Sequence, residues 1–266
     1  MAQGEKGSSI LGVKGSSEIL NNGIFSVLNP RPLEPFEIPI RRVGMLQTLE
    51  ERVRYKHTAL IIVDMQNDFC HEDGAFGKMG LNLSLIQKVA TPMKNLIESA
   101  HLFGVPVIFT KMLHSQWTNS EAWVQRNRSK KKGWVDEDKP SYPYCLPDTW
   151  GADWYGVPPA KEDYVVIKHR YGGFINTDLN LILRSLQKKS VIVTGVDTTL
   201  CVDCTARGAL MHDYYVIVAA DCCGGVDEEE HRFTLRTLDK YFGIVTTSDE
   251  IIRIWNAQKN NPRHNP

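Results

Sequence analysis

The chain has 266 residues, its 31 lysines and arginines balance 31 aspartates and glutamates, and 42% of its residues are hydrophobic. This composition is typical of a folded globular protein and excludes the disordered, collagen-like and disulfide-dense classes. A net charge of zero gives no overall field that would attract a nucleic-acid backbone or an anionic membrane. The one dense basic run, residues 126–132, is interpreted as a solvated loop, so we expect neither a nucleic-acid nor a membrane partner.

No apolar stretch reaches the roughly 18–20 residues that cross a bilayer, and the first residues lack the apolar core of a secretory signal. We therefore expect a cytoplasmic protein. In a reducing compartment its cysteines should remain thiols, which leaves reactivity or metal binding as roles to weigh. The six cysteines are Cys70, Cys145, Cys201, Cys204, Cys222 and Cys223.

Residues 1–45 are predicted to form an extended arm that is partly disordered. The first thirty residues are rich in Gly, Ser and Asn without a sustained period, and residues 30–40 contain four prolines. The folded domain is expected to span residues 46–260.

Within this domain, short apolar runs rich in β-branched residues alternate with segments of helical spacing. Continuous apolar runs are typical of parallel strands that are buried on both faces. Such alternation predicts an α/β fold, a three-layer sandwich with a central six-stranded parallel sheet flanked by helices. The predicted strands are 59–63, 106–110, 164–167, 190–194, 215–219 and 243–246, and the predicted helices are 83–103, 178–186, 201–212, 228–241 and 249–257.

The stretch of about 112–161 interrupts this alternation. It holds several prolines, the basic run and five tryptophans at 117, 123, 134, 150 and 154. A connection of ~50 residues is far longer than a simple loop, so we interpret it as a partly structured insertion over the site or at a subunit contact.

Three residue types with complementary chemistry follow the predicted strands. Asp64 follows the first strand, Lys168 the third, and Cys201 comes after the fourth strand and a turn. Ligands of open α/β sheets bind beyond the carboxyl ends of the strands, so these side chains are expected to converge. A cysteine that opens a helix beside an ammonium should have a lowered pKa and act as a nucleophile, with Asp64 as the proton shuttle and turn amides as an oxyanion hole.

Other interpretations of the same residues remain open. Taken singly, Asp64 is a loop hydrogen-bonding residue, Lys168 a surface lysine and Cys201 a small buried hydrophobic residue. Cys201 and Cys204 also match the spacing of a redox pair, and together with the adjacent cysteines at 222 and 223 they offer four thiolates to zinc. A non-catalytic α/β module that binds partners through the tryptophan-rich insertion is a further alternative.

Three blocks of the sequence resemble the isochorismatase-like cysteine hydrolases, which have a Rossmann-like fold. They are ALIIVDMQNDF at 59–69, the lysine that ends the third strand, and TGVDTTLCV at 194–202. By this resemblance Asp64, Lys168 and Cys201 correspond to the family's catalytic triad. The resemblance also implies a cis peptide between Val196 and Asp197, and an oxyanion hole formed by the backbone N–H groups of Asp197 and Cys201.

Two further blocks bear on the substrate. KHRYGGFINTDL at 168–179 resembles the ureidoacrylate amidohydrolases, whereas the Asp-Cys-Cys-Gly run at 221–224 is closer to the biuret hydrolases. The resemblance therefore implies cleavage of a small ureido or carbamoyl amide through a Cys201 thioester, with release of ammonia or carbamate. N-carbamoylsarcosine-type and nicotinamide-type amidases are the alternatives within the family. Family members are usually oligomeric, so a homo-oligomer, dimer or tetramer, is expected.

Candidate substrate-binding residues complete the predicted site. Arg170 presents a planar guanidinium suited to a substrate carboxylate or carbonyl, with a surface or interface salt bridge as its alternative role. Phe69, Trp117 and Tyr171 are candidates for an aromatic pocket wall, and Phe69 is equally a candidate core residue. Nicotinamidases carry Asp-x-His after the second strand, where this chain reads Met-Leu-His at 112–114, so we expect no catalytic metal and no cofactor.

Overall fold

The structure is a computed structural model, and it describes residues 44–125 and 144–260. The predicted arm therefore lies outside the described residues except for Gly44 and Met45, and it stays a prediction. The basic run at 126–132 and Trp134 lie outside them as well. From Leu46 onward the described chain forms a compact unit.

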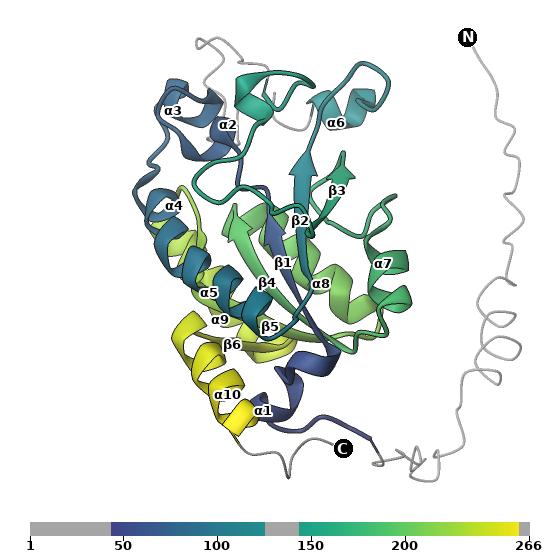
Figure 1. The fold of residues 1–266 in the computed structure, drawn as a ribbon. Coiled ribbons are helices and arrows are strands. Elements are labelled where there is room, and N and C mark those ends of the chain that lie inside the picture. Colours follow the sequence, from purple (N-terminus) through teal and green to yellow (C-terminus); the bar gives the residue numbers. More distant parts are fainter. Residues whose placement is uncertain (1–43, 126–143, 261–266) are drawn as a thin grey trace, which may run out of the picture. The chain divides into compact units, whose positions relative to one another are not determined.

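A parallel sheet of six strands in the order β3-β2-β1-β4-β5-β6 forms the centre of this unit (Figure 1). Each predicted strand is present, and the predicted fold class is confirmed. All residues of β1 and β4 are buried, as expected for apolar runs covered on both faces. The strands are β1 (Thr58–Val63), β2 (Val107–Met112), β3 (Tyr164–Lys168), β4 (Ser190–Val196), β5 (Tyr215–Gly224) and β6 (Ile244–Thr246).

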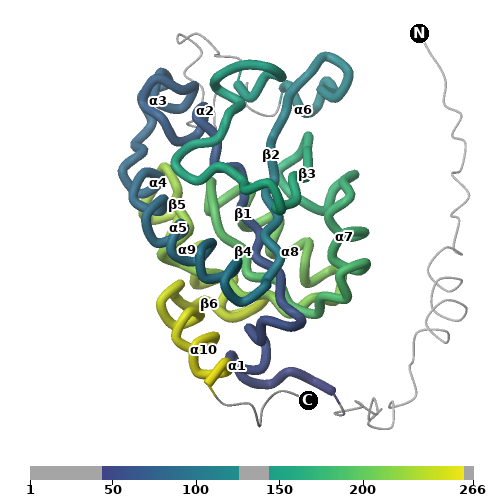
Figure 2. The backbone as a smooth tube through the Cα atoms, viewed as in Figure 1, coloured from purple at the N-terminus to yellow at the C-terminus, as the bar shows by residue number. Residues whose placement is uncertain are grey.

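Helices cover both faces of the sheet. The pair α4 and α5 packs with α10 on one face, whereas α8 and α9 pack on the other, and the tube in Figure 2 follows these crossovers. Trp255 on α10 is fully buried, and its indole N–H donates to the Val53 carbonyl at 2.6 Å. This bond fixes α10 to the chain just before β1. The main helices are α4 (Ser84–Lys88), α5 (Ala90–Leu102), α7 (Leu179–Ser185), α8 (Asp203–Met211), α9 (Glu228–Tyr241) and α10 (Ser248–Asn260).

Short elements lie around this framework. Before β1 the chain forms α1 (Leu49–Arg52) and η1 (Tyr55–His57), and after β1 it forms α2 (Asn67–Cys70) and α3 (Ala75–Lys78). Within the predicted insertion lie α6 (Glu121–Gln125) and η2 (Trp150–Ala152). Among the described residues, no helix combines the length and apolar character that a membrane crossing requires.

Two predicted helices differ from the observed ones. The helix predicted at 83–103 is divided at Val89, and Pro92 lies in the first turn of α5, where its missing N–H leaves no intrahelical bond unmade. Cys201 does not open α8 but lies in a π-helical turn, η3 (Thr198–Val202), that leads into it. Single π turns interrupt helices frequently at functional sites.

Gly195 brings β4 against β1 just before the turn that carries Cys201. Its φ is +112°, and a Cβ at this position would lie 2.1 Å from the carbonyl oxygen of Val63. Because the obstacle is backbone, no side-chain rearrangement can relieve it. The close approach of the two strands therefore requires glycine.

We expect Gly195→Ala to lower the free energy of unfolding by more than about 3 kcal/mol, because a disfavoured backbone conformation adds to a clash in the core. Gly104→Ala is the matched control. Gly104 also has a positive φ, +66°, but nothing lies within 4 Å of its added Cβ, so its cost should be about 1–2 kcal/mol. Urea unfolding of both variants measures the difference, and equal losses would contradict this account of Gly195.

Candidate active site

Asp64, Lys168 and Cys201 meet at the carboxyl ends of the strands, as the sequence predicted. Asp64 directly follows β1, Lys168 is the last residue of β3, and Cys201 lies in η3 after β4. The Lys168 Nζ lies 2.6 Å from Asp64 Oδ2 and 3.5 Å from Cys201 Sγ. In Figure 1 these strand ends point toward the end of the sheet where α2 and α6 lie.

Asp64 and Lys168 form an ion pair with no solvent exposure on either residue. The pair spans a whole strand, because β2 lies between β1 and β3 and neighbouring strands are about 4.8 Å apart. A long side chain such as lysine is needed to cross that gap. Lys168 Nζ also donates to the Arg170 carbonyl oxygen at 3.0 Å.

Thr110 on the intervening strand completes the environment of the carboxylate. Its hydroxyl donates to Asp64 Oδ1 at 2.9 Å, and both residues are fully buried. Asp64 thus has one oxygen on Thr110 and the other on Lys168. This division of contacts fixes the carboxylate plane relative to Cys201.

The electrostatic balance keeps Lys168 charged. Burial alone lowers the pKa of this ammonium, but the charge of Asp64, that of Cys201 in its thiolate form and hydrogen bonds to both raise it, and the net shift is upward from 10.5. A buried charge is tolerated here because it is paired and hydrogen-bonded.

Cys201 differs from the sequence prediction in its acidity. Burial raises the pKa of its thiol well above the ordinary 9.0, Lys168 acts in the opposite direction, and Asp64 raises the pKa further. Lys168 thus lowers this pKa as predicted, but burial and Asp64 outweigh it, so the net shift is upward and not downward. Because Asp64 opposes the effect of Lys168 and burial raises the pKa further, the thiol needs a base to become a nucleophile.

The turn that presents Cys201 is organised by Asp197. The carboxylate of Asp197 accepts hydrogen bonds from the Thr199 amide and hydroxyl, both at 2.7 Å, and from the Val226 amide at 3.1 Å. Its carbonyl accepts from the amides of Leu200 and Val202. The Val196–Asp197 peptide bond is cis. The amides of Asp197 and Cys201 were predicted to form the oxyanion hole. Neither is among the amides that donate to these Asp197 oxygens.

One contact to this turn had no signal in the sequence. His231 on α9 lies with Nδ1 2.9 Å from the hydroxyl of Thr198, the first residue of η3. The sequence predicted a helix over residues 228–241 but assigned no role to His231. The contact joins the turn to a helix that begins thirty residues later, a relation that only the fold creates.

Phe69 and Tyr171, two of the predicted aromatic residues, lie in different aromatic clusters. Phe69 is buried, and its ring packs edge-on against Phe76 and Tyr144, with centroids 5.0 and 5.8 Å away. Tyr171 is half-buried, and its ring centroid lies 4.8 Å from that of Trp123. Both therefore belong to aromatic clusters beside the strand ends.

Trp117 and Arg170 depart from their predicted placement. Trp117 is 87% exposed, which does not fit a buried pocket wall, and Trp123 is the tryptophan of this segment that packs against Arg170. The Arg170 guanidinium is already engaged by protein groups. Its Nη1 donates to the carbonyls of Thr118 at 3.0 Å and His169 at 2.6 Å.

The cysteine alternatives can be compared with the structure. All six cysteines are free thiols, including Cys201 and Cys204. Within residues 44–125 and 144–260, no three His, Cys, Asp or Glu side chains gather in a way that could hold a metal ion. The four-cysteine set considered for zinc is therefore not assembled in the described part of the chain.

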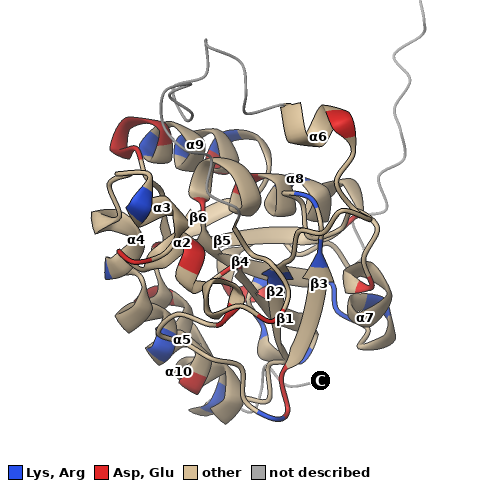
Figure 3. Cartoon of the chain, turned by 90° about the horizontal axis from the view of Figure 1, so that it is seen from above, with Lys and Arg blue, Asp and Glu red and all other residues tan. Residues whose placement is uncertain are grey.

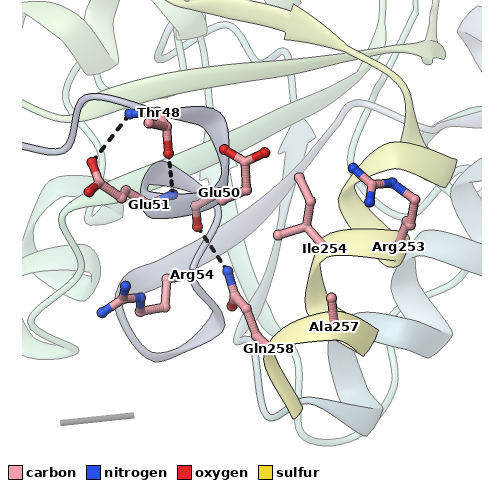
Figure 4. Close-up of a pocket in the computed structure, with 8 residues that line it drawn as sticks. All are labelled: Thr48, Glu50, Glu51, Arg54, Arg253, Ile254, Ala257 and Gln258. Carbon is pink, nitrogen blue, oxygen red and sulfur yellow. Dashed lines mark hydrogen bonds between the residues drawn. The ribbon is translucent and has the colours of Figure 1, made fainter. Parts of the chain in front are cut away.

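A cavity of about 370 Å³ lies elsewhere, between α1 and α10 (Figure 4). Gln258 donates to the Glu50 carbonyl across it, and Arg54 and Arg253 line it. It contains none of the predicted site residues, and α1 and α10 lie at the end of the sheet opposite to α2 and α6 in Figure 1. Seen from above (Figure 3), charges of both signs lie on the helices, and the first turn of α9 carries three consecutive acidic residues.

The chain is similar to proteins of one known family. The isochorismatase domain model matches residues 58–250. The ureidoacrylate amidohydrolase RutB of Stutzerimonas stutzeri is 28% identical over 232 residues, covering 81% of this chain and 87% of the relative. A cysteine hydrolase from Pseudomonas syringae pv. phaseolicola superposes with a TM-score of 0.65 at 26% identity, covering 77% of this chain and 95% of its own. An N-carbamoylsarcosine amidase from Thermoplasma acidophilum superposes with a TM-score of 0.56 at 26% identity, covering 72% of this chain and 96% of its own.

We expect Lys168→Met to lower the free energy of unfolding by about 3–5 kcal/mol, because it leaves the Asp64 carboxylate buried without its cation. The double variant Asp64→Asn/Lys168→Met removes both charges and should recover part of that loss. As a control, Lys111→Met removes a cation 3.7 Å from Asp153, whose side chain is 66% exposed, and should cost less than about 1 kcal/mol. Chemical denaturation measures the free energy of unfolding of all three variants. A loss in Lys168→Met no larger than that in Lys111→Met would contradict the assignment of Asp64 and Lys168 as a buried ion pair.

Proposed function

The chain belongs to the isochorismatase family, and we propose from that premise that it is a cysteine amidohydrolase that cleaves the C–N bond of a small ureido or carbamoyl amide. The observation that carries this proposal is the contact of Lys168 Nζ with both Asp64 Oδ2 and Cys201 Sγ, at 2.6 and 3.5 Å. Similarity to ureidoacrylate amidohydrolases and to an N-carbamoylsarcosine amidase supports an amide substrate of this class.

In the first step Asp64 acts as the base. Its carboxylate takes the proton from the Cys201 thiol as Sγ attacks the carbonyl carbon of the amide, and the carbonyl electron pair moves onto oxygen. The backbone N–H groups of Asp197 and Cys201 donate to this oxyanion. The raised pKa of the buried thiol supports a transfer that occurs with the substrate bound, rather than a standing thiolate.

In the second step Asp64 returns the proton to the amide nitrogen. The C–N bond breaks, the oxyanion re-forms the carbonyl, and ammonia or an amine leaves while the acyl group stays on Cys201 as a thioester. Asp64 then takes a proton from water, the resulting hydroxide attacks the thioester, and Cys201 regains its proton from Asp64. The sum is one amide and one water converted to one acid and one amine or ammonia.

Lys168 contributes charge and position without exchanging a proton. Its raised pKa keeps it cationic throughout, so it stabilises the sulfur anion as the thiol proton moves to Asp64. Phe69 and Tyr171 are proposed as walls of the substrate site because they lie in the aromatic clusters beside the strand ends. Homo-oligomeric assembly and a cytoplasmic location stay predictions.

Ammonia release from ureidoacrylate, biuret, N-carbamoylsarcosine and nicotinamide tests the proposal. We expect turnover of a ureido or carbamoyl compound by the native protein, none by Cys201→Ala, and a loss of about 10²–10⁴-fold in Asp64→Asn, because the acid–base step is removed. Cys204→Ala is the matched control and should keep its rate. Activity retained in Cys201→Ala, or turnover of nicotinamide alone, would overturn the proposed chemistry or the proposed substrate class.

We expect Thr110→Val to reduce kcat/KM about tenfold, because Asp64 loses the donor that orients its carboxylate. Thr110→Ser retains the hydroxyl and should stay within about threefold of the native value. Thr194→Val controls for loss of a buried hydroxyl, since Thr194 is equally buried but donates to the Ile61 carbonyl. Steady-state kinetics on the best substrate measures kcat/KM of each variant. Equal losses of kcat/KM in Thr110→Val and Thr194→Val would show that Thr110 does not orient Asp64.

A further inference from the structure

Arg170 connects two segments that follow neighbouring strands. The first is the α6 segment, residues 113–125 after β2, and the second is the turn after β3 that begins at His169. Arg170 Nη1 donates across this junction to the Thr118 carbonyl at 3.0 Å and, within its own turn, to the His169 carbonyl at 2.6 Å. One guanidinium nitrogen thus holds both segments.

Aromatic contacts strengthen the same junction. The Arg170 guanidinium lies over the Trp123 ring, 4.8 Å from its centroid, and Trp123 in turn packs against Tyr171. Such cation–π contacts are strongest when the cation is partly removed from water, and Arg170 and Trp123 are both half-buried.

Backbone groups of the two segments are also joined closer to the sheet. The Leu113 amide donates to the Lys168 carbonyl at 3.0 Å, and His169 Nδ1 lies 2.8 Å from the Leu113 carbonyl. The α6 segment is therefore fixed along its length to the turn after β3, and Arg170 supplies its outermost attachment.

The same residue reaches the proposed catalytic centre through its main chain. The Arg170 carbonyl accepts a hydrogen bond from Lys168 Nζ at 3.0 Å, beside the contacts of Lys168 to Asp64 and Cys201. Movement of Arg170 would therefore move an acceptor that holds the ammonium in place.

We propose that Arg170 is a positioning residue, whose guanidinium holds the α6 segment against the turn after β3 and whose carbonyl thereby fixes Lys168 beside Cys201. The proposal rests on the function proposed for Lys168 and Cys201. It replaces the sequence-based expectation that the guanidinium binds a substrate carboxylate, because protein carbonyls and an indole ring already engage that group.

The two roles make different demands on the side chain. A carboxylate-binding group is replaced in part by any cation, so lysine should preserve a preference for anionic reagents and glutamine should lose it. A group that holds two carbonyls and an aromatic face needs the planar fork of arginine, which neither lysine nor glutamine provides. The variants Arg170→Lys and Arg170→Gln therefore separate the roles.

Arg207→Lys is the matched control. Arg207 also lies over an aromatic ring, that of Phe242 at 4.1 Å, and pairs with Asp203, but it is on α8 and not on the α6 segment. The first measurement is hydrogen–deuterium exchange in the full-length protein. We expect exchange of residues 113–125 to increase in both Arg170 variants and to stay at the native level in Arg207→Lys.

The second measurement is alkylation of Cys201 by iodoacetamide, which is neutral, and iodoacetate, which is anionic, with Cys201→Ala as the blank. We expect the ratio of the two rate constants to stay within about twofold of the native ratio in both Arg170 variants. If Arg170 instead bound the carboxylate of the reagent directly, Arg170→Gln would slow alkylation by iodoacetate about tenfold and leave alkylation by iodoacetamide unchanged. This readout does not depend on knowing the substrate.

The pH profile of iodoacetamide alkylation reports on Lys168. Because the ammonium of Lys168 lowers the thiol pKa, a less firmly held Lys168 should shift the profile to higher pH in both Arg170 variants. Unchanged exchange, an unchanged profile or a selective loss with iodoacetate would each overturn the positioning role. A native protein whose Cys201 resists both reagents across the pH range would instead refute the proposed nucleophile, whatever the exchange data show.

Discussion

The buried ion pair of Asp64 and Lys168 is the constraint on which the rest of the site depends. The two charges lie at the ends of β1 and β3, with β2 between them, and neither has any solvent exposure. Such a pair is costly to bury, and it persists because Thr110 and the Arg170 carbonyl satisfy the remaining contacts. The ion pair therefore holds the ends of β1 and β3 at a fixed distance across β2. Through the Arg170 carbonyl it also fixes the turn after β3.

In the proposed mechanism this pairing also governs the activation of Cys201. A lone ammonium beside the thiol would favour a permanent thiolate, but the Asp64 carboxylate offsets it and burial raises the pKa of the thiol. In the proposed mechanism, the thiolate of Cys201 forms as its proton moves to Asp64, while Lys168 and the turn amides lie beside the developing negative charge. Asp197 shapes that turn through its carboxylate and its carbonyl.

Much of this could be predicted from the sequence, because strands and strand ends leave a local signal. The apolar runs predicted the strands, and their carboxyl ends placed Asp64, Lys168 and Cys201 together. Contacts between elements leave no such signal: nothing local distinguishes Thr110 from other strand threonines, or Trp123 from Trp117. The net upward shift in the pKa of Cys201 was missed for the same reason, since it depends on burial and on a carboxylate 137 positions away in the chain.

The proposed mechanism requires that the acyl group of the substrate is transferred to Cys201. Acid quenching during turnover of the preferred amide, followed by peptide digestion and mass spectrometry, tests it most directly. We expect the peptide containing Cys201 to carry the acyl mass, and neutral hydroxylamine to remove it, as expected of a thioester. Product formation in the same sample without any adduct on Cys201, or with the adduct on another residue, would contradict the account.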